Sequence, residues 1–338
     1  MSGLKILSIL PSATIQDLGR TGLLRYGVTS SGAMDAYALA EGQALLGNGA
    51  DDAAIEFAQF GGRFQAQMAM SVAFSGARME LSLNGQPIGW RQVILLRKGD
   101  ILDVGAAIEG VYGYLHVSGG FQTDVTLKSR STHLRAGFGH VLKTGQVLAI
   151  GAADRVVGIN CLPARDYFKQ RRLRALWGPQ SQYFDAETRA KFAAASFEVS
   201  KMRDRMGIQV HPDCGPILSS AGLSIASDSI SPGDIQITGD GTPAILLADR
   251  GPTGGYPRIA TLATVDMPVL AQIPTGESFS LEFISRQAAV ALLATFRAEI
   301  ATMAAKVKPM LRDPRDIQDL LAFNLISGVT AGKSEDEN

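Results

Sequence analysis

Cysteine, histidine and aromatic residues are scarce in this chain of 338 residues. The two cysteines, Cys161 and Cys214, form neither a CxxC pair nor a zinc spacing. We expect both to be buried free thiols, which suits a reducing compartment. The four histidines are too scattered for a metal triad, so no metal ligands are predicted. Aromatic residues make up 7% of the chain, which disfavours a base-stacking surface for nucleic acid.

Excess charge and long apolar runs are also absent. Lys plus Arg and Asp plus Glu each number 32, so the charge balance indicates neither a nucleic-acid partner nor an anionic membrane. No stretch approaches the roughly 20 apolar residues of a membrane span, and residues 1–10 are too short and mixed for a signal peptide. We therefore expect a cytoplasmic protein. Apolar side chains are plentiful, at 46%, which is enough for one large or two medium domains.

Short strands that follow polar, glycine-containing turns recur in both halves of the chain. Such strands, with few helices, predict a mainly β protein built from barrels or sandwiches. The expected organisation is a β domain at 1–162, a connector and helix at 163–195, a second β domain with a terminal helix at 196–308, and a partly disordered extension at 309–338. The four turns are Lys98–Asp100, Lys143–Gln146, Pro232–Asp234 and Thr275–Glu277.

The stretch from Thr14 to Asp35 combines charged groups with four glycines instead of a regular pattern. Asp17 and Arg20 are close enough in sequence to pair across a turn, and the glycines allow the backbone to approach a ligand closely. Asp35 opens an apolar helical run, where the helix start favours a carboxylate or could hold an anion. The stretch is therefore either a capped turn with a structural ion pair or part of a binding site.

Two further polar stretches occur at strand ends. Ser118–Gly120 and Ser129–Thr132 form one, and Asp249–Arg250 with Thr253–Tyr256 forms the other. The Asp-Arg pair is either a structural salt bridge or part of a substrate or phosphate site, because arginine binds carboxylates and phosphates bidentately. The candidate catalytic residues are Asp17, Arg20, Asp35, Asp249 and Arg250. The candidate substrate- or phosphate-binding residues are Ser31, Gly32, Met34, Gly119, Gly120, Arg130, Ser131, Thr253, Gly254, Gly255 and Tyr256.

Two sequence motifs imitate nucleotide-binding loops. Residues 328–334 have one residue too few between the glycines for a P-loop. Residues 239–244 match a dinucleotide fingerprint, but Pro243 and a strand follow where a helix is required, so we expect a hairpin turn. His116 lies in an apolar strand and is either a core histidine or a ligand or base. No biotinyl-lysine context is present.

The motifs Thr14–Arg20, Gly32–Asp35, Ala248–Arg250 and Thr253–Pro257 resemble the family of the 5-oxoprolinase C subunit. That family is also called KipA-like or allophanate hydrolase subunit 2, and it is similar to half of the carboxyltransferase domain of urea carboxylase. The similarity runs from about residue 4 to 284. It implies two cyclophilin-like β-barrel domains with a few peripheral helices.

The resemblance also implies function and partners. We expect a hydrolase subunit that opens 5-oxoproline to glutamate with ATP and magnesium, active in complex with the KipI-like B subunit of the enzyme and with its A subunit. Biotin would be used only if a partner chain supplied it. Two alternatives stay open: a biotin-dependent carboxyltransferase-like subunit that acts on urea or a related amide, and a KipA-like regulatory partner of a kinase inhibitor. Departures from the family pattern at Gln209 and Gly251 bear on whether the substrate is this lactam or another amide.

Overall fold

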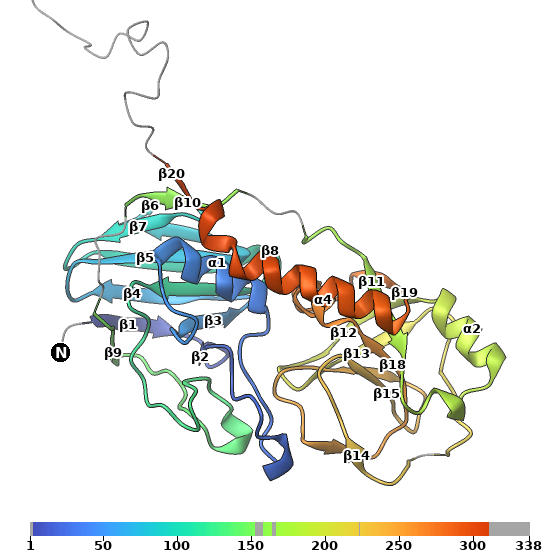
Figure 1. Cartoon of the computed structure of the whole chain (residues 1–338). Helices are drawn as coiled ribbons and strands as arrows, with labels where there is room; N and C mark the ends of the chain where they lie inside the picture. Colours follow the sequence, from blue (N-terminus) through green and yellow to red (C-terminus); the bar gives the residue numbers. More distant parts are fainter. Residues whose placement is uncertain (1–2, 153–157, 164–166, 223, 311–338) are drawn as a thin grey trace, which may run out of the picture.

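The computed structural model describes residues 3–152, 158–163, 167–222 and 224–310 (Figure 1). Strands dominate the chain, and the expected mainly β fold class is confirmed. The N-terminal half is a nine-stranded sheet that curves into a half-barrel, and the C-terminal half contains a closed seven-stranded barrel. No helix in the described ranges is both long and apolar enough to cross a membrane.

The N-terminal sheet has the strand order β2-β3-β8-β4-β1-β9, and β5 pairs with β8 as well as with β6 and β7. β5 and β8 are the longest strands and form an antiparallel ladder whose register shifts at three places. Such irregularities bend a sheet, which allows this one to curl around its core. The strands are β1 (Gly3–Ile9), β2 (Thr14–Gln16), β3 (Ala54–Ala58), β4 (Gly62–Ala66), β5 (Met70–Leu83), β6 (Gln86–Pro87), β7 (Val93–Leu96), β8 (Ile101–Val117) and β9 (Val147–Ala149).

The C-terminal barrel closes in the order β11-β18-β15-β16-β13-β12-β19. Its first strand, β11, lies inside the range expected for the connector. All four predicted turns directly precede a strand, namely β8, β9, β15 and β19, and residues 239–244 join β15 to β16 as the expected hairpin. The barrel strands are β11 (Arg172–Trp177), β12 (Ser196–Arg203), β13 (Gly207–Pro212), β15 (Asp234–Ile237), β16 (Pro243–Leu246), β18 (Arg258–Leu262) and β19 (Ser278–Phe283). Two small sheets pair β10 (Asn160–Cys161) with β20 (Lys308–Pro309), and β14 (Asp228–Ser229) with β17 (Thr253–Gly254).

Three helices begin at side-chain caps that the sequence offers. Asp35, Asp185 and Ser285 each accept a hydrogen bond from the backbone N–H three residues later, which satisfies a free donor of the first turn. Helices are thereby confirmed at all three predicted places. The helices are α1 (Ala36–Leu46), α2 (Ala186–Ala194), α3 (Met267–Gln272) and α4 (Arg286–Ala301), with 3-10 turns η1 (Leu24–Tyr26), η2 (Leu134–Ala136), η3 (Ser181–Tyr183), η4 (Thr264–Asp266) and η5 (Met303–Lys306).

One hydrophobic cluster spans both halves, and a second large cluster lies within the N-terminal sheet. One cluster of buried residues includes Tyr112 and Tyr114 of β8 together with Phe197, Ile208 and many other barrel residues. Figure 1 shows α4 running along both halves, with its C-terminal end beside α1. Tyr37 of α1 donates to Glu299 of α4 at 2.8 Å. The halves are therefore packed against each other and not merely tethered.

The expectation of buried thiols is wrong. Cys214 is exposed in the turn after β13, and Cys161 is half-buried in β10; both are free. Turn residues lie at the surface, so the neighbouring prolines and glycines were a better guide to Cys214 than its apolar neighbours. The P-loop-like residues 328–334 and most of the extension expected to be disordered lie outside the described ranges.

Candidate functional site

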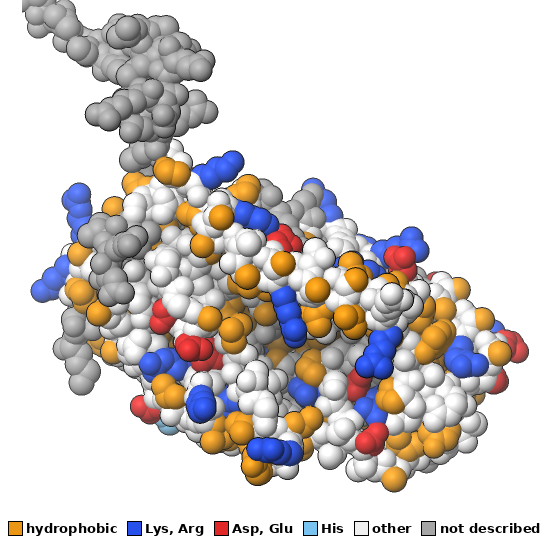
Figure 2. All heavy atoms as spheres, viewed as in Figure 1, with side chains coloured by type: hydrophobic (Ala, Val, Ile, Leu, Met, Phe, Trp, Pro, Cys, Tyr) orange, Lys and Arg blue, Asp and Glu red, His pale blue; other side chains and the backbone are white. Residues whose placement is uncertain are grey.

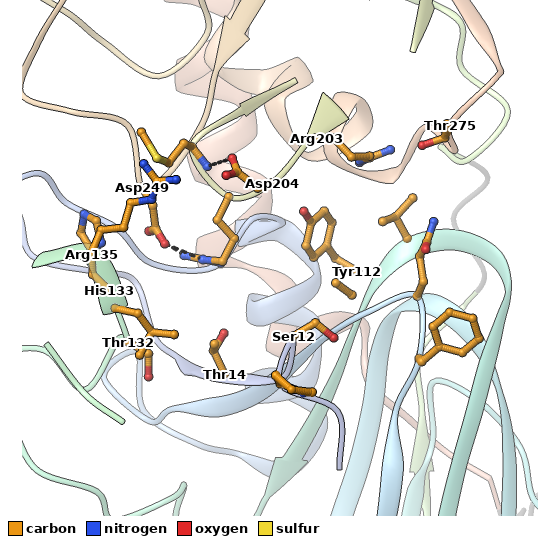
Figure 3. Close-up of a pocket in the computed structure, with 18 of the residues that line it drawn as sticks. Ser12, Thr14, Tyr112, Thr132, His133, Arg135, Arg203, Asp204, Asp249 and Thr275 are labelled. Carbon is orange, nitrogen blue, oxygen red and sulfur yellow. Dashed lines mark hydrogen bonds and ion pairs between the residues drawn. The ribbon is translucent and has the colours of Figure 1, made fainter. Parts of the chain in front are cut away.

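A cavity of about 780 Å³ lies between the two halves (Figure 3). The N-terminal half contributes Ser12, Thr14, Tyr112 and the segment 132–135, and the C-terminal half contributes the segment 201–206. Figure 3 shows Asp249 and Asp204 entering from the barrel side and Thr14 and Thr132 from the opposite wall. The cavity has the size of a small-molecule site, and it has polar groups on both walls.

Arg205 links the two walls of this cavity. Its Nε donates to Asp249 Oδ2 at 2.9 Å, one terminal nitrogen binds Glu56, and the other donates to the carbonyl of Gly32 at 2.6 Å. Burial alone lowers the pKa of Arg205, but the charges of Glu56 and Asp249 outweigh it and raise that pKa above its ordinary value. Arg205 therefore stays charged and holds the barrel against the N-terminal sheet.

Asp249 is held by donors from both halves. Ser31 Oγ donates to Asp249 Oδ1 at 2.6 Å, and Arg205 donates to both carboxylate oxygens. The salt bridge between Asp249 and Arg250, one of the two alternatives for this pair, is not formed. Arg250 is buried inside the barrel half, where its Nε donates to the carbonyl of Ile230 at 3.0 Å, and it does not line the cavity.

Glu56 supports Arg205 from the N-terminal sheet. Its second carboxylate oxygen accepts from the backbone N–H of Met34 at 2.8 Å and from the Tyr114 hydroxyl at 2.7 Å. Burial raises the pKa of Glu56, while Arg205 and these two donors act in the opposite direction. Met34, a predicted binding residue, therefore contributes its backbone to this network.

Asp17 organises the loops beside the cavity. It is 4% exposed, and its carboxylate accepts from the backbone N–H of Gly19 at 2.8 Å, from Ser129 Oγ at 2.6 Å, from the backbone N–H of Arg130 at 2.6 Å and from Ser131 Oγ. The four donors occupy its lone pairs. The structure thus brings the first and second predicted stretches together around this carboxylate.

Arg20 does not pair with Asp17, so the structural ion pair, one of the two alternatives for this stretch, is not formed. Its Nε donates to the carbonyl of Thr126 at 3.1 Å and one terminal nitrogen donates to that of Ser131 at 2.6 Å. The guanidinium lies 4.6 Å from the ring centre of Phe138. Burial lowers the pKa of Arg20, and the charge of Asp17 opposes this. Arg20 therefore holds the loop 126–131 against the stretch that follows β2. It does not line the cavity.

Asp35 joins the start of α1 to the other half. One carboxylate oxygen caps Ala38, and the other accepts from the Tyr167 hydroxyl at 2.6 Å and from Gln272 Nε2 at 2.8 Å. Gln272 belongs to α3 and also bonds the backbone of Tyr112 in β8. Asp35 is fully buried and lies outside the cavity lining.

The glycines of the three stretches lie against protein atoms. A Cβ added to Gly32 would meet the backbone of Leu18, and one added to Gly119 would meet that of Gly151. Gly120 faces Asp52, and Gly254 faces Gln236. Close packing therefore explains these four glycines.

The remaining predicted binding residues also lie outside the cavity lining. Arg130 donates to Gln122 Oε1 at 2.6 Å and binds the carbonyl of Thr123. Thr253 begins β17, and Gly255 follows that strand. Tyr256 is 40% exposed. Of the sixteen predicted residues, Asp249 alone lines the cavity, and Ser31, Gly32 and Met34 belong to the hydrogen-bond network behind it.

Several cavity residues were missed at the sequence level, although a signal was present. Lys201 and Arg203 alternate with other residues, so the period-2 geometry of β12 places them on one face, and Arg205 follows between β12 and β13. Arg203 donates to the carbonyls of Ile273 and Ala271 at 2.6 and 3.0 Å. Lys201 has no ion pair with a residue in the described ranges, and neither does Arg135 on the opposite wall. These two cations are therefore available to a ligand.

His133 lies in the cavity wall next to Arg135. It is 5% exposed, and its Nε2 is 3.1 Å from Thr29 Oγ1. Burial lowers the pKa of His133, so the ring is neutral near pH 7. The described part of the chain contains no group of three or more His, Cys, Asp or Glu side chains that could hold a metal ion.

Comparison with known proteins gives the family. The family model for the carboxyltransferase domain, subdomains A and B, matches residues 26–283. The chain belongs to the carboxyltransferase domain family. It is 37% identical to the 5-oxoprolinase C subunit of Haemophilus influenzae, covering 85% of this chain and 93% of that protein, and 32% identical to the Escherichia coli protein of the same name, covering 81% and 89%. The resemblance stated from the sequence motifs is confirmed.

Similarity also extends to much longer enzymes. Urea amidolyase of Lachancea kluyveri is 30% identical over 86% of this chain, which spans 17% of that protein. The crystal structure of Kluyveromyces lactis urea amidolyase superimposes with a TM-score of 0.80 at 24% identity, covering 93% of this chain and 21% of that one. The latter match supports the fold alone.

Proposed function

We propose that this chain is the C subunit of an ATP-dependent 5-oxoprolinase, which opens the lactam ring of 5-oxoproline to give glutamate, and that it acts with partner A and B subunits. The observation that supports this most directly is the 37% identity to a protein named as the C subunit of 5-oxoprolinase, over 93% of its length. Such a name implies further subunits. The cavity between the halves is the place where a small substrate would bind.

The charges of the cavity fit an anionic substrate. 5-Oxoproline carries a carboxylate, and Arg135 and Lys201 are cavity cations that no carboxylate within the described ranges neutralises. Arg205, in contrast, is already engaged by Glu56 and Asp249. We therefore assign substrate-carboxylate binding to Arg135 and Lys201, and positioning of the walls to Arg205.

The lactam carbonyl develops negative charge when water adds to it, and hydrogen-bond donors aimed at that oxygen stabilise the charge. Burial raises the pKa of the Tyr112 hydroxyl, so it keeps its proton. The neutral ring of His133 can hold or accept a proton at the same cavity. These two residues are the proposed groups for proton transfer at this wall. Asp249, which already accepts three hydrogen bonds, orients Arg205.

ATP and magnesium belong to the complex in this proposal. Magnesium is commonly held by one or two carboxylates together with the phosphates themselves. Asp204 is the exposed carboxylate of the cavity, but it already accepts from the backbone N–H groups of Met206 and Gly207. The described residues of the cavity therefore do not form a magnesium site from protein ligands alone. We assign no ATP-dependent step to this chain.

The test is co-purification with the cognate A and B subunits followed by an assay of 5-oxoproline-dependent ATP hydrolysis. Arg135→Met and Lys201→Met should each raise the KM for 5-oxoproline by about 10- to 100-fold, the range expected for a lost charge-assisted hydrogen bond. Lys98→Met, in an exposed turn of the N-terminal sheet, is the matched control and should change nothing. A wild-type complex that hydrolyses ATP no faster with 5-oxoproline than without it contradicts the proposal.

A second candidate is a carboxyltransferase-like subunit that acts on urea or a related amide. The family name and the 30% identity to a urea amidolyase favour it. Biotin would then have to arrive on a partner chain. Carboxylation of urea by the assembled proteins that stops when avidin is added would support this candidate over lactam hydrolysis.

A further inference from the structure

Two segments of the N-terminal half repeat one another at a spacing of 110 residues. Residues 20–27 and 130–137 share the pattern Arg-x-x-x-Leu-Arg-x-Gly. Each pattern folds into a 3-10 turn, η1 or η2, that ends at a left-handed glycine, with φ of 77° at Gly27 and 75° at Gly137. We call η1 and η2 the twin turns.

The backbone of the twin turns repeats as well. The N–H of Val28 donates to the carbonyl of Leu23 at 3.3 Å, and the equivalent N–H of Phe138 donates to that of His133 at 3.1 Å. Neither turn contains a buried residue, but buried residues flank them in the chain, namely Arg20 and Thr29 around the first and His133 before the second. The repeated turns therefore form an exposed surface and are not part of the core.

The twin turns are fixed side by side. Arg20, at the base of the first, donates to the carbonyls of Thr126 and Ser131 in the loop that carries the second. Thr29 bonds His133 at 3.1 Å. Figure 1 places both turns together at the lower edge of the N-terminal half. A surface that is already held in place loses little conformational entropy when it binds a partner.

The side chains that the twin turns present are apolar and cationic. Tyr26 is 68% exposed and Leu134 is 47% exposed, and Leu24 lies nearby in the first turn. Arg25 and Arg135 stand among them without an ion pair to any residue of the described ranges, and residues 20–28 and 130–138 contain no carboxylate. Figure 2 shows hydrophobic and basic side chains mixed along this edge. Tyrosine and arginine around apolar residues are typical of the energetic centre of a protein interface.

The second of the twin turns also borders the cavity. Leu134 and Arg135 belong to the second turn and to the cavity wall at once. A protein that contacts this turn therefore reaches the edge of the cavity.

We propose that the twin turns are the docking surface for a partner subunit that presents carboxylates around an apolar centre and covers this side of the cavity. The inference rests on the proposed function, which supplies the partner subunits. An acidic side chain matches the unpaired Arg25, and an apolar centre matches Leu24, Tyr26 and Leu134, while Arg135 stays assigned to the substrate. Docking would exclude water from the side of the cavity where Arg135 and His133 lie.

The test uses the full chain and the cognate A and B subunits, each titrated separately by calorimetry. The double variant Arg25→Glu/Tyr26→Ser changes the first turn and touches no cavity residue. It should weaken the binding of one of these partners by at least about 100-fold, because it removes a central aromatic side chain and reverses a charge. Lys98→Glu is the matched charge reversal on another surface and should bind as wild type does. Arg25→Ala serves as a milder variant, and thermal unfolding verifies that each protein is folded.

Activity separates the two proposals. When the weakly bound partner is added to saturation, the double variant should recover 5-oxoproline-dependent ATP hydrolysis. A double variant that binds both partners with wild-type affinity overturns the docking surface, even if the wild-type complex is an active 5-oxoprolinase. A wild-type complex that forms through the twin turns but leaves 5-oxoproline unchanged overturns the proposed function and supports the docking surface.

Discussion

Arg205 is a largely buried cation, with 15% of its side chain exposed, that two carboxylates from different halves share. Replacing it by methionine keeps much of the volume but leaves Glu56 and Asp249 without their counter-charge. Breaking a buried ion pair in this way typically costs about 3–5 kcal/mol. We expect Arg205→Met to lower the free energy of unfolding by this amount in urea denaturation. Arg63→Met removes a surface ion pair in which the Arg63 side chain is 53% exposed and that of Asp103 is 37% exposed. This variant should lose under about 1 kcal/mol of unfolding free energy. Equal losses for the two variants would contradict a structural role for the buried network.

His116 gives the folded state a dependence on pH. It is 1% exposed, its Nε2 lies 2.9 Å from Ser75 Oγ, and burial lowers its pKa from 6.5 to about 3. The unfolded state therefore binds more protons between these values, so the stabilisation is present above pH 6.5 and is lost as the pH falls. The loss approaches about 1.4 kcal/mol per pH unit.

Denaturation at pH 7.5, 6.5, 5.5 and 4.5 measures this slope. His116→Gln should flatten it, whatever the variant's overall stability. His140 has an exposed side chain, so His140→Gln should keep the wild-type slope. An unchanged slope in His116→Gln would mean that other groups carry the acid sensitivity.

The residues around the cavity also show how far sequence reasoning reaches. The charged and glycine-rich stretches were recognisable as special, because their composition is local information. Their partners were not, because Ser31 and Asp249 are 218 residues apart and Arg205 and Glu56 are 149 apart. Asp17 and Arg20 are close in the chain, but each forms hydrogen bonds with the loop 126–131 and not with the other. Which charges meet depends on how the loops and halves pack, and the sequence pattern does not encode that directly.

At the scale of elements, local chemistry predicted well. Each of the four glycine-containing turns precedes a strand, and three helices begin at capping side chains, because turns and caps are decided by a few adjacent residues. β2 was not predicted, since three residues are too few for a pattern and its pairing with β3 supplies the stability. β12 was expected only as part of the second β domain, yet its alternating cations mark the cavity wall.

The N-caps of α1 and α2 offer a matched pair of aspartates. Asp35 and Asp185 both cap a helix, but Asp35 is buried and also accepts from Tyr167 and Gln272, whereas Asp185 is exposed. Asp35→Ala should lower the free energy of unfolding by at least about 3 kcal/mol, because it removes a cap and leaves buried donors without an acceptor. Asp185→Ala should cost distinctly less. Similar losses in urea denaturation would show that the contacts of Asp35 beyond its cap contribute little.

At the scale of the whole molecule, the cavity exists only because the two halves pack together. Neither half alone contains both the segment 132–135 and the segment 201–206. The sequence indicated two β domains but could not say how they face each other. The core cluster that includes Tyr112 and Phe197 crosses the boundary, as do Arg205 and Gln272. These contacts make it more favourable for the halves to unfold together than one at a time.

The chain carries one tryptophan in each half, which allows this cooperativity to be measured. Trp90 lies in the N-terminal half, 6.0 Å from the ring of Phe168, and Trp177 stacks on Phe283 of the barrel at 3.9 Å. In Trp177→Phe the fluorescence reports Trp90, which packs against the N-terminal core and against the cluster shared by both halves, and in Trp90→Phe it reports the barrel. Coincident transitions by different probes are the mark of all-or-none unfolding. We expect each variant's fluorescence midpoint in urea to match its own circular dichroism midpoint. A fluorescence transition that completes before the circular dichroism change, in either variant, would mean that the halves unfold separately and that the shared core and Arg205 couple them only weakly.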